Sequence, residues 1–251
     1  MMKTKVLVLL ALISVSCSKT YNPYSEDPSD PDYAYNRPVG ASANDILSAV
    51  KYNSLKIELQ YMKGFAPDAS ALDHLRNTVA DIINKPGGIT IITKEIPASA
   101  NTVLTIDQVM EVERKNRTVF STGNQLGIYL LYTDGNFNDD KVLGAAYRNS
   151  SMVLFGKKIR DNSGGIGQAS RTKLEATVME HEFGHIMGLV DVGSAMQTNH
   201  KDDAHGNHCN NQNCLMNYAA ETTDLLGFLI TGNIPVFDAN CHADLKANGG
   251  K

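Results

Sequence analysis

Apolar residues between positions 55 and 155 recur first with the period of a strand and then with that of a helix. Every second residue from Leu55 to Tyr61 is apolar, which predicts a half-buried strand. From Leu72 to Ile83 the apolar residues fall on one helical face, after the helix-starting Asp68, which predicts a helix. The same reasoning predicts further strands at residues 89–96, 126–132, 142–147 and 151–155, and a helix at residues 105–116.

A longer helix is predicted from Ser170, a suitable N-cap, to Gly188. Gly188 has no Cβ, so it can adopt the left-handed conformation that ends a helix and turns the chain back. The residues that follow, up to about Met216, are rich in Asn, Asp, His and Gly. A loop of this length inside a compact domain is usually functional, so we expect the chemistry of the protein there.

The predicted helix carries the sequence His181-Glu182-Phe183-Gly184-His185. Two histidines four residues apart differ by about 40° around a helix axis, so both imidazoles can bind one metal ion. Glu182 is turned by about 100° toward the open side of the metal. This His-Glu-x-x-His arrangement is typical of zinc peptidases, in which the glutamate is a general base rather than a ligand. It predicts a Zn²⁺ ion on His181 and His185, with Glu182 as the catalytic base.

Two residues are candidates for the third zinc ligand. Counted from the helix, Asp191 stands three residues after Gly188; counted back from Met216, His208 is the candidate. We favour His208, because imidazole is the commoner zinc ligand and leaves the metal the stronger Lewis acid, whereas a carboxylate cancels part of its charge. Asp191 would then accept a hydrogen bond from a ligand histidine or cap a loop.

Residues 181–218 resemble the metzincin clan of zinc metalloproteases. The long motif His-Glu-x-x-His-x-x-Gly-x-x-His/Asp is followed by a methionine turn, here Met216. The order His208, Cys209, four residues, Cys214, Leu215, Met216 is similar to archaemetzincins, and an aspartate at the register of Asp191 is similar to snapalysin-type metzincins. The resemblance implies an α+β, metzincin-like zincin fold, with a mixed twisted sheet, an active-site helix and a small C-terminal subdomain after the third ligand.

The same resemblance implies roles for residues around the metal. Met216 would pack beneath the zinc without a chemical role. Tyr218 stands where astacin-like and serralysin-like metzincins place a tyrosine that stabilises the oxyanion; the alternative is a core aromatic residue with a satisfied hydroxyl. Peptide substrate would add as a strand to a sheet edge, and residues 150–155 are the segment expected at that edge.

The polar loop and the residues after it hold further metal-binding residue types. His200, His205, Asp202 and Asp203 belong either to a solvated surface or to a second metal site.

Three cysteines of this part, Cys209, Cys214 and Cys241, are disulfide candidates in an oxidising compartment. Archaemetzincins use extra cysteines for a second zinc. Their closing Cys-x-x-Cys is absent here, since only Cys241 follows, so an all-cysteine site is excluded.

The first residues predict export. Lys3 and Lys5 precede an apolar run that ends before Ser16, which is typical of a signal peptide over residues 1–16. Cys17 resembles the lipid-bearing cysteine of bacterial lipoproteins. Residues 17–41, which hold four of the eight prolines, are expected to form a disordered tether, and residues 42–251 one metalloprotease domain. These features imply an extracytoplasmic protein of the cell envelope, lipid-anchored at the outer membrane or cell surface.

Composition narrows the remaining classes of function. The chain is 20% charged and 42% hydrophobic with a formal net charge of -4 and no basic block, which argues against nucleic-acid partners. No apolar run reaches the roughly 20 residues that a mature membrane-spanning helix needs. We therefore predict a monomeric, lipid-anchored zinc endopeptidase that acts on protein or peptide substrates. The alternative is a catalytically inert surface lipoprotein in which a structural zinc supports a binding module; Glu182 favours the enzyme, because a structural site needs no base.

Overall fold

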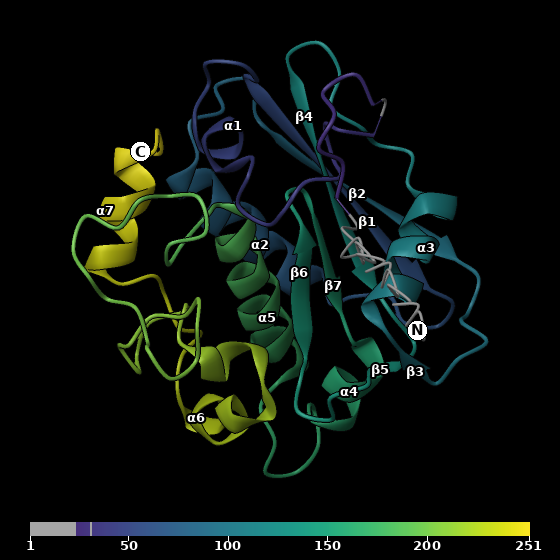
Figure 1. The fold of residues 1–251 in the computed structure, drawn as a ribbon. Coiled ribbons are helices and arrows are strands. Elements are labelled where there is room, and N and C mark those ends of the chain that lie inside the picture. The colour runs from purple at the N-terminus through teal and green to yellow at the C-terminus, as the bar shows by residue number, and fades with distance from the viewer. Residues whose placement is uncertain (1–23, 31) are drawn as a thin grey trace, which may run out of the picture.

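Five strands form the mixed sheet that carries the fold (Figure 1). The computed structural model describes residues 24–30 and 32–251. The strands are β1 (Ser54–Met62), β2 (Ile89–Ile96), β4 (Gln125–Tyr132), β6 (Gly144–Arg148) and β7 (Ser151–Leu154), in the order β2-β1-β4-β7-β6. Only β6 runs antiparallel to its neighbour; the other pairs are parallel. The expected α+β class with a mixed sheet is confirmed.

Helices cover both faces of this sheet. α2 (Ala69–Ile82) and α5 (Arg171–Ile186) contribute to the larger hydrophobic core, and α3 (Ile106–Asn116) contributes to a smaller core on the other face. Alternate residues of β4 enter the two cores, Leu130 the larger and Leu131 the smaller. A strand buried on both faces has no polar side, which is why residues 126–132 are apolar throughout.

Local capping explains where the long helices begin. The Asp68 side chain accepts from Ala71 N at the start of α2, and Ser170 accepts from Lys173 N at the start of α5. Thr105 forms a capping box at the start of α3. These three starts agree with the sequence-based predictions within a residue or two.

Short elements complete the structure, and the sequence pattern did not predict them. They are α1 (Ala43–Leu47), β3 (Val103–Leu104), β5 (Asn136–Phe137), α4 (Gly156–Asp161), the 3₁₀ helices η1 (Tyr218–Glu221) and η2 (Thr223–Leu225), α6 (Leu226–Thr231) and α7 (Ala239–Ala247). Each is too short to show a clear apolar period. The last four lie after the polar loop, where a small C-terminal subdomain was expected.

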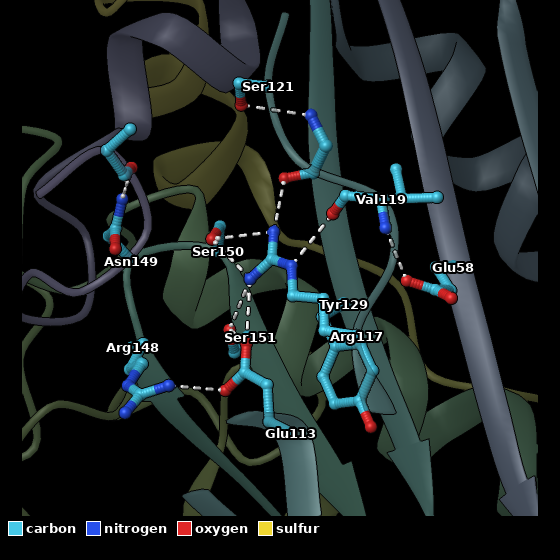
Figure 2. A network of polar contacts seen from close by, with 12 residues as sticks. Glu58, Glu113, Arg117, Val119, Ser121, Tyr129, Arg148, Asn149, Ser150 and Ser151 are labelled. Atoms are coloured by element: carbon cyan, nitrogen blue, oxygen red, sulfur yellow. Dashed lines mark hydrogen bonds and ion pairs between the residues drawn. The ribbon is translucent and has the colours of Figure 1, made fainter. Parts of the chain in front are cut away.

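A buried polar network ties the edge strand β6 to the rest of the sheet (Figure 2). The Glu113 carboxylate on α3 accepts from Arg117 Nη1 at 2.7 Å and from Arg148 Nη1, on β6, at 2.8 Å. Ser151 Oγ on β7 donates to the same carboxylate at 2.6 Å, and Arg117 donates to the Gly127 carbonyl of β4 at 3.1 Å. Because every charge has a partner, the network can be buried without an unpaired ion.

The described part of the expected tether packs on the domain. Arg37 N donates to Asn149 Oδ1 at 3.0 Å, and the ring centroids of Tyr35 and Phe120 are 4.9 Å apart. Gly40, at φ +77°, approaches the Val192 carbonyl so closely that a Cβ would overlap it. Asn149, in the turn between β6 and β7, also donates to the Ala34 carbonyl at 3.0 Å, so the turn contacts the chain between residues 34 and 37.

The sequence features that predict export are not among the described residues. The expected signal peptide, residues 1–16, and Cys17 lie outside the described residues. Within residues 24–30 and 32–251, no helix has both the length and the apolar character needed to cross a membrane.

Candidate metal centre

Three imidazoles converge beside the sheet. His181 and His185 lie on the buried helix α5, and their Nε2 atoms are 3.0 Å apart. His208 comes from the polar loop, and its ring centroid lies 5.3 Å from that of His181 and 5.1 Å from that of His185. Together with Glu221, these side chains offer ligand atoms that all lie within 4.8 Å of one another.

Backbone carbonyls fix the orientation of two of these rings. His181 Nδ1 donates to the Leu215 carbonyl at 2.7 Å, and His208 Nδ1 donates to the His205 carbonyl at 2.7 Å. A neutral imidazole that donates through Nδ1 keeps the lone pair on Nε2, where a metal can bind it. Both rings therefore present Nε2 to the same point.

Met216 packs beneath the helix that carries the histidines. Gly184, between the two histidines, leaves the space: a Cβ there would lie 3.0 Å from Phe237 Cε1 and nearer still to Met216 Sδ. Gly188 ends the helical turn at φ +82°, and a side chain there would collide with the Ser194 backbone. The two glycines let the methionine turn and the loop approach the metal-binding face of α5.

Glu182 lines a cavity of about 360 Å³ together with His185 and His208. It is fully buried, and no side chain among the described residues donates a hydrogen bond to its carboxylate. Burial raises the pKa of Glu182 well above its usual range, and the charge of Glu221 adds to the shift. Burial also lowers the pKa of His185, which favours the neutral imidazole that binds metals.

Glu221, at the end of η1, is the residue that sequence reasoning missed. Its Oε2 atom lies 3.6 Å from His181 Nε2 and 3.9 Å from His185 Nε2, and its Oε1 atom lies 3.3 Å from His208 Nε2. Burial alone would raise the pKa of Glu221, but the neighbouring imidazoles of His181 and His208 hold it well below the usual value. No motif or spacing in the sequence marked this glutamate.

The other candidate for the third ligand lies away from the histidines. Asp191 has φ +71°, its side chain is 56% exposed, and its Oδ2 atom lies 3.4 Å from Lys201 Nζ. Tyr218, proposed to stabilise an oxyanion, stacks its ring on His205 with 3.7 Å between centroids. His205 also contacts Asp202 at 2.6 Å and lines the cavity. The structure thus brings His208, and not Asp191, to His181 and His185.

The substrate edge proposed from the sequence is corrected by the sheet order. β7, within the expected segment 150–155, lies between β4 and β6 and has partners on both sides. The edge strand is β6, whose Ala145 and Ala146 line the cavity next to Glu182. The sequence showed two adjacent strands but not which of them would be outermost.

A second cluster is formed by residues of the polar loop and of the start of α7. His200, Cys209, Asp238 and Cys241 offer ligand atoms within 4.8 Å of one another. His200 Nδ1 lies 3.3 Å from Cys209 Sγ, and its other nitrogen, Nε2, is 2.8 Å from Asp244 Oδ2. A carboxylate on the second nitrogen is the usual way in which proteins orient a metal-binding histidine. His200 therefore belongs to a buried polar cluster rather than to a solvated loop.

Cys214 borders this cluster. Its Sγ atom lies 3.5 Å from Cys241 Sγ, and it accepts from the backbone N–H groups of Met216 and Asp238, both at 3.4 Å. Hydrogen bonds from Cys209 and Cys241 lower the pKa of the Cys214 thiol to about 4. Cys209, Cys214 and Cys241 are all free thiols, so the expected disulfide is not formed in this structure. Both clusters are consistent with zinc binding.

Comparison with known proteins identifies the fold. No family model matches this chain, and no curated protein matches it. Among solved structures, archaemetzincin from Methanopyrus kandleri is similar, with a TM-score of 0.52 and 16% sequence identity over 78% of this chain and 96% of that chain. With its mixed five-stranded sheet and its histidine-bearing helix, this chain has an archaemetzincin-like fold.

Proposed function

We propose that this protein is a zinc-dependent endopeptidase. The observation that carries the proposal is the convergence of His181, His185 and His208 on one point, with Glu182 on the wall of the same cavity. Three histidines and an adjacent glutamate base are the residue types that zinc peptidases use. The archaemetzincin-like fold supports this assignment.

The donor set fits a zinc ion. Zinc prefers imidazole nitrogen and thiolate ligands in tetrahedral sites, and the three Nε2 atoms face one another at short range. No side chain among the described residues donates a hydrogen bond to the buried carboxylate of Glu182, and the buried His208 Nε2 faces the Glu221 carboxylate at 3.3 Å. A cation in the site would satisfy these atoms. His181, His185 and His208 would hold the ion.

Each residue around the cavity would have its own role in peptide hydrolysis. Bound zinc would polarise the peptide carbonyl and lower the pKa of the attacking water. Glu182 accepts the proton of that water and passes it to the leaving amine. The carbonyls of Leu215 and His205 hold two imidazoles in place during this exchange. Tyr218, stacked beside the cavity, is the candidate donor to the oxyanion.

An extended peptide is the substrate class that suits this cavity. β6 is an edge strand, so a peptide can add to the sheet beside it as a further strand. Ala145 and Ala146 line the cavity from β6 with small side chains, which leaves room for a substrate backbone near Glu182.

The second cluster is a candidate for a structural zinc. Its candidate ligands are His200, Cys209, Asp238 and Cys241, which are residue types that zinc binds. Cys214 Sγ, 3.5 Å from Cys241 Sγ, is a further thiol beside them. Such an ion would hold the polar loop that delivers His208.

The N-terminal sequence supports a place in the cell envelope. A signal peptide over residues 1–16 and a lipid on Cys17 would anchor a monomeric enzyme at the outer membrane or cell surface.

Zinc content and peptide hydrolysis test the proposal together. The purified protein should bind two zinc ions per chain, and Cys241→Ser should reduce this to one. It should cleave casein or a peptide library in a chelator-sensitive manner, and Glu182→Gln should keep the zinc at the histidine site and lose about 10²- to 10⁴-fold in rate. Equal rates for wild type and Glu182→Gln would contradict the role of the base. Zinc binding without hydrolysis by any form would favour the inert binding module.

A further inference from the structure

We propose that Glu221 is a fourth protein ligand of the histidine site and closes it, so that a substrate has to displace this carboxylate before it can reach the metal. This inference rests on the proposed zinc site. Catalytic zinc sites have three protein ligands and an open position, whereas sites with four protein ligands are closed to substrate. The position of Glu221 therefore decides which kind of site the chain forms.

The distances around Glu221 fit a closed tetrahedral site. Four ligands about 2.0 to 2.1 Å from a tetrahedral zinc lie roughly 3.3 to 3.4 Å from one another. Glu221 Oε1 lies 3.3 Å from His208 Nε2, and the other oxygen of the same carboxylate, Oε2, lies 3.6 Å from His181 Nε2 and 3.9 Å from His185 Nε2, so the carboxylate faces all three imidazoles. His181 and His185 Nε2 are 3.0 Å apart. The carboxylate thus stands where a water or a substrate carbonyl would bind in an open site.

Backbone hydrogen bonds hold Glu221 in this position. Leu143 N donates to the Glu221 carbonyl at 2.8 Å, and Thr223 N donates to the Lys141 carbonyl at 3.0 Å. Val142 and Thr222 form an antiparallel bridge between these two bonds. The Glu221 side chain is 23% exposed, so it can be reached from solvent although it is largely buried.

The same hydrogen bonds cover part of the path that substrate would take. Residues 141–143 lead directly into the edge strand β6, and residues 221–223 pair with them through one isolated antiparallel bridge and its two hydrogen bonds. A peptide extending along β6 in this direction would have to replace that pairing. Movement of residues 221–223 would release the zinc ligand and the edge together, which couples substrate entry to opening of the metal site.

The charges in the cavity agree with this arrangement. Glu182 and Glu221 both line it, and two carboxylates facing one buried space repel each other unless a cation or a proton lies between them. A zinc ion that binds Glu221 neutralises one of them and leaves Glu182 free beside it. Glu182 then has no water to deprotonate until Glu221 leaves.

The test uses full-length protein loaded with Co²⁺, whose visible absorption reports the number and type of its ligands. Glu221→Gln and Glu221→Asp are compared with Asp224→Asn, which changes a 41% exposed carboxylate three residues further on that contacts Lys141 at 3.5 Å. Both Glu221 variants should change the Co²⁺ spectrum. Glu221→Gln should also bind a small hydroxamate at least about tenfold more tightly than wild type, equal to about 1.4 kcal/mol of relieved competition. Asp224→Asn should match wild type in both measurements.

Peptide hydrolysis separates this inference from the proposed function. Unchanged Co²⁺ spectra and hydroxamate affinities in both Glu221 variants would overturn the closure, even if the protein cleaves peptides. Changed spectra with no hydrolysis by wild type or Glu221→Gln would leave the closure standing and overturn the peptidase. The expected result is changed spectra together with faster hydrolysis by Glu221→Gln, and loss of that hydrolysis in the Glu182→Gln/Glu221→Gln double variant.

Discussion

Replacing Gly184 by alanine tests how tightly the methionine turn is packed under the metal site. The new Cβ would lie 3.0 Å from Phe237 Cε1 and nearer still to Met216 Sδ. Ordinary contacts between such atoms are about 3.5 to 4.0 Å, so the sulfur must move by more than about 1 Å and the Phe237 ring by about 0.5 to 1 Å. Met216 and the neighbouring Leu215 are fully buried, and the Leu215 carbonyl orients His181. The displacement is therefore expected to reach a metal ligand.

Two opposing terms set the size of the effect on stability. Alanine is favoured over glycine within a helix by about 1 kcal/mol, whereas overpacking a dense core costs about 1 to 3 kcal/mol. Gly227→Ala, in helix α6, is the matched control, because a Cβ there meets nothing within 4 Å. The metal-free Gly184→Ala protein should thus be about 1 to 3 kcal/mol less stable than Gly227→Ala. A displaced carbonyl partner should also weaken zinc binding by about 10- to 100-fold.

Urea denaturation of the metal-free variants measures the first quantity, and competition with a chromophoric chelator measures the second. Equal free energies of unfolding for the two alanine variants, with unchanged zinc affinity in Gly184→Ala, would refute the packing argument. Weaker zinc binding with no loss of stability would place the strain in the loop rather than in the core.

Two further predictions concern the third ligand and acid stability. His208→Ala should lose zinc as completely as His185→Ala, whereas Asp191→Asn should keep it, as judged by zinc content after dialysis; the reverse order would assign the metal to Asp191. Burial alone would raise the pKa of Glu58, but hydrogen bonds from Thr118 and its neighbours hold it below the usual 4.5. Its contribution to stability should be present above about pH 4.5 and disappear as the pH falls through the lowered value, because the unfolded chain then binds a proton that the folded chain excludes. Glu58→Gln should flatten this acid limb in urea unfolding at a series of pH values, and an unaltered limb would contradict the assignment.

Sequence periodicity located the main elements because their signals are local. Residues 89–96 are β2 without any shift, and the helix predicted at residues 105–116 begins one residue later, after its Thr105 cap. Strand order has no such local signal. The pattern showed strands near residues 142–147 and 151–155, yet only the register of β6 on β7 reveals which one is the edge.

Some residues of the candidate site can likewise be predicted from local spacing, whereas others come together only through the fold. His181, Glu182 and His185 lie within one helical turn, so their spacing alone predicts that they act together. Glu221 reaches them only because residues 221–223 pair with residues 141–143, about eighty positions earlier in the chain. Asp191 had the right spacing, but positive φ angles of 56° and 71° at Val190 and Asp191 turn its side chain toward Lys201. Sequence spacing within a loop does not determine where a side chain points, because the backbone there has no regular repeat.

The polar loop connects the two metal-binding clusters through adjacent residues. His208 belongs to the histidine site and Cys209 to the cysteine cluster, while Leu215, which orients His181, directly follows Cys214. Cys209 N donates to the Met216 carbonyl at 2.7 Å, so the two ends of this loop are also joined by their backbone. The polar loop has few apolar side chains, so hydrophobic packing alone does little to hold it in place. A metal on the cysteines would therefore fix both the third histidine and the carbonyl that orients the first, which gives the cysteine cluster a direct effect on the catalytic geometry.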